Sequence, residues 1–155
     1  MDDSVQTAQL ATVLAVERKR FENDQQRGLL PVEAGSGTGY HRRWTREDAF
    51  RIALFYLLRD HFGLAPRPAA ALAAAEDAAR RFEPGRTILA VYLHQGTFHL
   101  EALPEQVSTA DEGGFDVFPG PKDAGAVAVN VPAVMMIDAG RLDREIAERW
   151  IRIGG

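Results

Sequence analysis

Residues 9–44 read QLATVLAVERKRFENDQQRGLLPVEAGSGTGYHRRW, and this stretch decides the fold. It begins with apolar residues at the three-to-four spacing of a buried helix face, which are Leu10, Ala11, Val13 and Leu14. Ala15 and Val16 are expected to form a turn, with Val16 pointing inward. The next helix, residues 17–27, has Phe21 as almost its only large apolar residue. Only a narrow stripe of this second helix can therefore be buried, and most of its surface is expected to be exposed.

The glycine-rich part of the stretch predicts a turn between strands. Gly28 is a candidate C-cap for the second helix, and Pro31 prevents that helix from resuming. Residues 32–43 contain three glycines, which permit a tight reversal between two short strands. A helix, a turn, an exposed helix and a hairpin in this order are typical of a winged helix-turn-helix.

Two more helices are predicted before a change in pattern. Thr45 and Asp48 fit a loose capping box at the start of a strongly apolar helix that Gly63 would end. An alanine-rich run, residues 69–81, predicts a further helix by propensity. Pro84 and Gly85 then mark the expected boundary between two halves, residues 1–84 and 85–155.

The second half alternates as strands do. Its pattern around Gln95 and Gly96 predicts a hairpin, with Tyr92, His94, Thr97 and His99 on one face. A valine-rich run, residues 126–137, favours a buried strand that Pro132 must break or place at an edge. Asp138 is a candidate cap for a final helix whose apolar face is expected to hold Leu142, Ile146, Ala147, Trp150 and Ile151. The predicted class is α+β: about four helices and a two-stranded wing, then a small unit of hairpin, strands and final helix.

Composition narrows the classes of function. The chain has 155 residues, no cysteine and a formal net charge of −4. The lack of cysteine excludes disulfides and thiolate sites. No apolar run approaches the roughly 20 residues that cross a bilayer, and the N-terminus lacks the pattern of a signal peptide, so the expected location is the cytoplasm, without a membrane partner.

The charge distribution matters more than its sum. A uniformly acidic surface would repel a duplex, but residues 17–46 are locally basic. The second helix offers charged donors and bidentate amides that match phosphates and base edges. The wing ends in aromatic and basic groups, of which Arg42 or Arg43 is expected to reach the backbone or minor groove. The candidate DNA-binding residues are Arg18, Lys19, Arg20, Asn23, Gln26, Arg27, Tyr40, His41, Arg42 and Arg43.

A known family shares this arrangement. QLATVLAV, a basic helix, GLLP, a glycine-rich loop, GY, an aromatic residue and a helix opening with T-x-x-D together resemble the MerR-like winged helix-turn-helix DNA-binding domain, over roughly residues 7–80. The resemblance implies that residues 17–27 are the recognition helix and residues 40–43 the wing. Three features depart from the family pattern. Glu22, Asn23 and Asp24 stand where the family has an Arg and two aromatics, the wing is about one residue longer, and the long dimerising coiled coil is missing.

Other kinds of site have weaker support. The loop at residues 35–39 lacks the GxGxxG spacing and the preceding strand of a phosphate-binding loop. His94 and His99 could share a metal, but no third ligand is evident, so neither a metal nor a cofactor is predicted. The serines lie in predicted loops without a base partner, which argues against an enzyme.

The sequence thus predicts a sequence-specific, double-stranded DNA-binding transcriptional regulator, with the recognition helix in the major groove and the wing on the flanking backbone. So small a head suggests a homodimer or side-by-side copies on DNA. The second half is a candidate for self-association, for contact with RNA polymerase or another regulator, or for effector binding. The alternative is a protein-interaction module on a helix-turn-helix scaffold that has lost DNA binding, which Glu22, Asp24 and the net charge favour.

Overall fold

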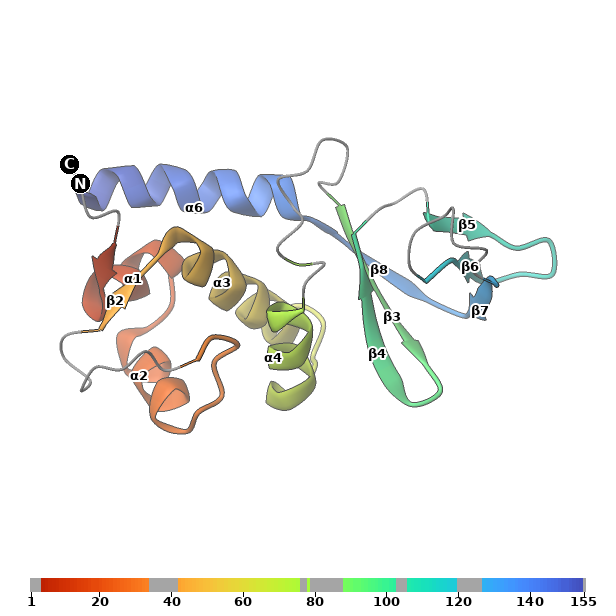
Figure 1. The fold of residues 1–155 in the computed structure, drawn as a ribbon, viewed down its shortest axis with the longest axis horizontal. Helices are drawn as coiled ribbons and strands as arrows, with labels where there is room; N and C mark the ends of the chain where they lie inside the picture. The colour runs from red at the N-terminus through yellow and green to blue at the C-terminus, as the bar shows by residue number, and fades with distance from the viewer. Residues whose placement is uncertain are drawn as a thin grey trace. The chain divides into compact units, whose positions relative to one another are not determined.

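The fold comes from a computed structural model that describes residues 4–33, 42–75, 78, 88–102, 106–119 and 127–154. Within these ranges the protein has a mixed α+β fold with five helices and three small antiparallel sheets (Figure 1). The predicted α+β class is confirmed. The chain divides into two compact units, residues 1–74 with 141–155, and residues 75–140.

The first unit opens with strand β1 (Val5–Gln6) and helix α1 (Thr7–Leu14). The four apolar residues predicted to form one face of α1 are all buried. Thr7 is the first helical residue, and Gln6 holds the cap position. The Thr7 hydroxyl accepts a hydrogen bond from the Trp44 indole N–H at 3.1 Å, so this threonine joins the helix to a distant part of the chain.

Helix α2 (Arg18–Gln26) follows after a tight turn, as the sequence predicts. Ala15 ends α1 in the left-handed conformation, with φ of 53°, and Val16 is half-buried. Phe21 is fully buried and meets the Trp44 ring edge-on, with 5.5 Å between centroids. Gly28 takes a φ of 65° just after the helix, which is the conformation expected of a residue that stops it.

The strand at the end of the glycine-rich stretch has a different partner from the predicted one. Strand β2 (Arg43–Trp44) pairs antiparallel with β1, with Val5 opposite Trp44 and Gln6 opposite Arg43. Residues 32 and 33 are not in a strand, and residues 34–41 lie outside the described ranges, so a hairpin within 32–43 is not seen in what is described. Burial explains the pairing, because it places Val5 and Trp44 together in the core.

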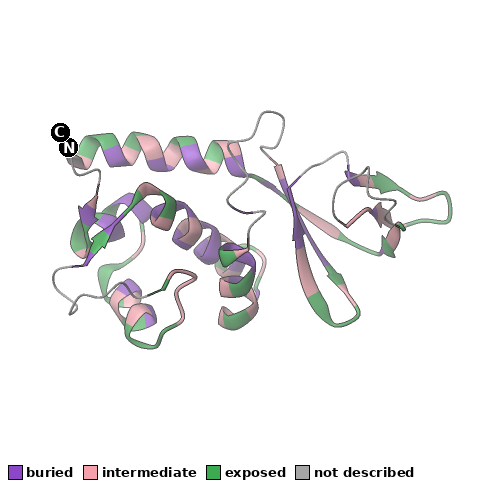
Figure 2. Ribbon diagram, viewed as in Figure 1, coloured by how far each residue is buried: buried purple, intermediate pink, exposed green. Residues whose placement is uncertain are grey.

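Two helices complete the part of this unit that residues 1–74 form. Helix α3 (Arg46–Asp60) begins with the predicted capping box, in which Thr45 and Asp48 bond to each other's backbone. It is the central core element, with seven buried residues, and Figure 2 shows its long buried stretch. Helix α4 (Pro66–Ala74) begins three residues before the predicted start, at a proline whose fixed φ suits the first helical position.

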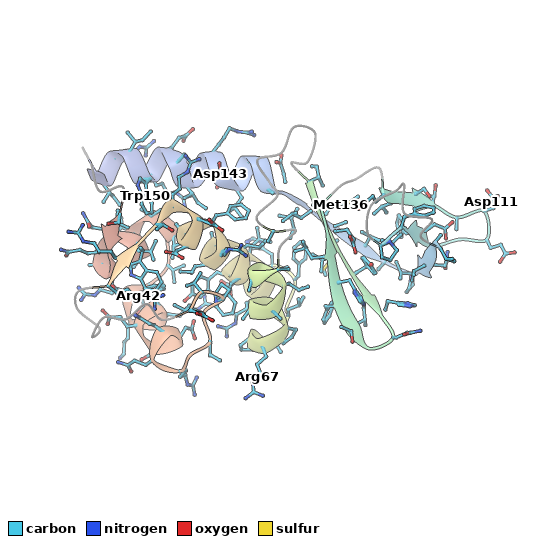
Figure 3. The ribbon with its side chains drawn as sticks, viewed as in Figure 1. Arg42, Arg67, Asp111, Met136, Asp143 and Trp150 are labelled. Carbon is cyan, nitrogen blue, oxygen red and sulfur yellow. The ribbon has the colours of Figure 1, made fainter. Side chains whose placement is uncertain are left out.

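The last helix also belongs to this unit. Helix α6 (Ala139–Gly154) was expected in the second half, but residues 141–155 group with residues 1–74. Asp143 forms an ion pair with Arg46 at 2.7 Å, and the Arg149 guanidinium donates to the Val13 carbonyl at 3.2 Å. Trp150 is buried on the same helix, where Figure 3 labels it together with Asp143. Ile151, which was expected on the apolar face, is 74% exposed.

The second unit contains the predicted hairpin. Strands β3 (Ile88–His94) and β4 (Thr97–Glu101) pair with Tyr92 opposite His99, and β8 (Val134–Asp138) lies on the other side of β3. The two turn residues, Gln95 and Gly96, both have positive φ, which is the geometry that closes two-residue hairpins. The predicted turn position is therefore confirmed.

A smaller sheet packs beside this one within the second unit. It consists of β5 (Val107–Thr109), β6 (Phe115–Val117) and β7 (Val129–Val131), in that order. Pro132 follows β7 and precedes β8, so it splits the valine-rich run as expected. Tyr92 forms a buried cluster with Val117 and Val131. The register places Tyr92, His94, Thr97 and His99 on one face of the hairpin, as predicted.

Candidate nucleic-acid interface

One face of α2 carries only hydrogen-bond donors and amides. Lys19, Asn23, Gln26 and Arg27 are all exposed. Their spacing of four, three and one residues places them on one side of a helix. Phe21 and Asp24, which lie three residues apart, are buried on the opposite side. The exposed face therefore presents two cations and two amide groups, and the carboxylate at its edge, Glu22, is paired with Arg18. We call these four residues the α2 donor face.

The two carboxylates of α2 are both paired with arginines. Glu22 pairs with Arg18 one turn earlier, at 2.7 Å. Asp24 is buried, where it accepts a hydrogen bond from the Tyr56 hydroxyl at 3.0 Å and pairs with Arg59 at 3.2 Å. The negative charge of Asp24 is thus balanced within the protein and does not face the solvent side of the helix.

Arg20, predicted to contact DNA, is bound to α3 instead. Its guanidinium donates to both carboxylate oxygens of Asp60, at 2.9 and 2.6 Å, and lies 4.8 Å from the centre of the Tyr56 ring. The hydrogen bond to Asp60 raises the pKa of Arg20, and the same bond lowers the pKa of Asp60. These contacts place Arg20 between the helices, not on the α2 donor face.

Arg42, labelled in Figure 3, is also turned inward. Its guanidinium lies over the Trp44 ring, 3.8 Å from the centroid, and donates to the Glu33 carbonyl. Burial lowers the pKa of Arg42. Of the two arginines expected to reach a duplex backbone, Arg43 is the exposed one, with its side chain near the Ser4 carbonyl at 3.5 Å.

The ten predicted contact residues therefore fall into three groups. The α2 donor face and Arg43 are exposed, and Arg18 is exposed but bonded to Glu22. Arg20 and Arg42 are held by contacts within the protein. Tyr40 and His41 lie outside the described residues. The sequence could have predicted that one of the acidic residues of α2 is buried. Asp24 lies three positions after the buried Phe21 and therefore shares its face of the helix.

Models of known protein families and curated protein sequences contain no match to this chain. The case for a function therefore depends on the exposed chemistry of α2 and β2.

The histidines of the hairpin do not form a metal site in the described residues. The rings of His94 and His99 lie 6.3 Å apart, and His99 stacks on Tyr92 at 5.2 Å. The Tyr92 hydroxyl donates to buried Glu101 at 3.3 Å, and burial raises the pKa of Tyr92. Across the described ranges, no group of three or more His, Cys, Asp or Glu side chains could hold a metal ion. Nor is any described helix long and apolar enough to cross a bilayer.

Proposed function

We propose that this protein is a sequence-specific, double-stranded DNA-binding transcriptional regulator of the MerR-like winged helix-turn-helix type. The observation that carries the proposal is the α2 donor face, where two cations and two amides are exposed together and the bordering carboxylate, Glu22, is paired with Arg18. The fold of α1, α2 and α3 around Phe21 supports it, because a buried edge fixes α2 to the unit while its other side is left for a partner.

The chemistry of this face suits a major groove. Asn23 and Gln26 can each make paired hydrogen bonds to an adenine edge, and Arg27 can pair with a guanine. Lys19, a flexible point charge, suits a phosphate. Arg43 on β2 is an exposed cation that suits the flanking backbone. In this arrangement α2 reads bases while β2 fixes the position of the protein on the duplex.

The overall charge of −4 does not oppose this proposal. Binding depends on the local potential of the surface that approaches the duplex. The acidic groups closest to the donor face along α2 are neutralised, Glu22 by Arg18 and Asp24 by Arg59. One head of this size contacts few base pairs, so useful specificity calls for a homodimer or side-by-side copies.

The test compares two matched double variants by fluorescence anisotropy on pooled duplexes, and then on a selected site. Lys19→Ala with Arg27→Ala removes both cations of the α2 donor face. Arg144→Ala with Arg152→Ala removes the same charge from exposed positions on α6. We expect the first pair to weaken binding and to reduce the slope of log K against log salt by about 1, because Lys19 is the phosphate contact of the pair and each such contact contributes about 1.

The control pair should leave the slope unchanged. Equal losses from the two pairs would mean that general charge, not the α2 donor face, determines binding. No binding by the wild-type protein at low salt, together with no retention on heparin, would reject DNA binding and favour a protein-interaction module on the same scaffold.

A further inference from the structure

Two ion pairs of opposite direction connect α2 with the last turn of α3. Arg20 of α2 pairs with Asp60 of α3, and Asp24 of α2 pairs with Arg59 of α3. Tyr56 lies between them, since its ring is under Arg20 and its hydroxyl donates to Asp24. We call these five residues the α2–α3 clamp.

The two halves of the clamp differ in burial. The Asp24 and Arg59 side chains are 8% and 23% exposed, whereas those of Arg20 and Asp60 are 38% and 44% exposed. Breaking the inner pair by removing one partner would leave a charge buried and uncompensated, which is costly. The outer pair is open to solvent, so its residues can be exchanged without burying a charge.

The order of charges makes the clamp sensitive to the position of α2. Arg20 and Asp24 are one turn apart on α2, and Arg59 and Asp60 are consecutive on α3. A shift of α2 by one turn along its axis would bring Asp24 to the place of Arg20, beside Asp60. Like charges placed together disfavour that register, so the clamp selects one placement of α2 over its neighbours.

The geometry points to Arg20 and Asp24 as positioning residues of the proposed recognition helix: they fix the rotation and register of α2 so that its donor face is directed outward, and they do not touch the nucleic acid. This inference rests on the proposed DNA-binding function. It reassigns Arg20 from a contact residue to a positioning residue. It also explains why an acidic residue, Asp24, occurs on this helix, because its buried carboxylate helps to fix the register of α2.

A charge swap on the outer pair tests the inference in the full-length protein. Arg20→Asp alone places like charges at Asp60 and should weaken binding to the selected duplex by about ten-fold. Arg20→Asp combined with Asp60→Arg restores opposite charges and should return affinity to within about two-fold of wild type, with an unchanged salt slope. Lys19→Ala is the contact control, because it should lower both affinity and slope by the loss of one phosphate contact.

Hydrogen exchange of the α2 amides provides a readout that does not need DNA. Arg20→Asp should raise exchange in α2, and the swap should restore its protection. If Arg20→Asp leaves α2 exchange unchanged, the positioning role is wrong whatever the protein binds. Alternatively, the swap restores the protection of α2 while affinity stays low and the salt slope of binding stays reduced by about 1. That result would show that Arg20 itself contacts a phosphate, which overturns the inference. If the swap restores the protection of α2 but the wild-type protein binds no duplex, the proposed function is rejected while the clamp still stands.

Discussion

The packing of α6 on the first unit predicts that a substitution near the end of the chain destabilises the N-terminal helices. Ile146 is 1% exposed on α6, and it lines a groove of about 280 Å³ together with Leu14 and Leu57. Ile151 lies on the same helix and is 74% exposed. Ile146→Ala and Ile151→Ala are therefore the same chemical change at a buried and an exposed site.

The expected magnitude follows from the atoms removed. Ile146→Ala deletes three buried carbons, worth about 2.4 kcal/mol at roughly 0.8 kcal/mol each. The higher helix propensity of alanine returns about 0.4 kcal/mol, and the cavity left behind costs a further amount. The groove beside Ile146 limits that cavity cost, because the new space opens to it. We expect a loss of about 2 to 3 kcal/mol for Ile146→Ala, and a change within about 0.5 kcal/mol for Ile151→Ala.

Tryptophan fluorescence during urea unfolding measures this loss in the correct unit. The chain has two tryptophans, Trp44 and Trp150, and both are buried in the first unit. With a urea slope of about 1.5 kcal/mol/M, the midpoint of Ile146→Ala should fall by about 1.5 M. Equal midpoints for Ile146→Ala and Ile151→Ala would refute the packing of α6 on this unit.

Two further predictions concern a glycine and a tyrosine. Gly114→Ala should lower stability by about 2 to 3 kcal/mol in thermal unfolding followed by circular dichroism, because an added Cβ would lie 2.8 Å from the Val131 carbonyl oxygen at a φ of 74°. Gly96→Ala has the same φ but open space around it, so it should cost only about 1 kcal/mol, and equal losses would contradict the steric explanation. Burial and the bond to Asp24 raise the pKa of Tyr56, so its contribution to stability is complete below about pH 10, the unfolded pKa, and is lost as pH rises further. Tyr56→Phe should therefore show a smaller fall in urea midpoint between pH 8 and pH 11, and an unchanged fall would exclude Tyr56 as its source.

Sequence patterns within a few residues of each other predicted local structure well. The Thr45 and Asp48 capping box starts α3, the Gln95 and Gly96 pair turns the hairpin, and Pro132 separates β7 from β8. Each depends on backbone geometry that neighbouring residues determine by themselves. The period of apolar residues likewise predicted the buried face of α1 and the placement of Phe21.

The sequence by itself thus determined the α+β class, the cap of α3, the hairpin turn, and which helix is mostly exposed. Only the tertiary structure decided that β2 pairs with β1, that α6 returns to the first unit, and that Arg20, Asp24 and Arg42 face the protein. The physical reason is distance along the chain. From the sequence alone, a charged side chain such as that of Arg20 is predicted to face solvent, because its partner Asp60 is 40 residues away in the chain. Periodicity within one helix carries no information about such a partner.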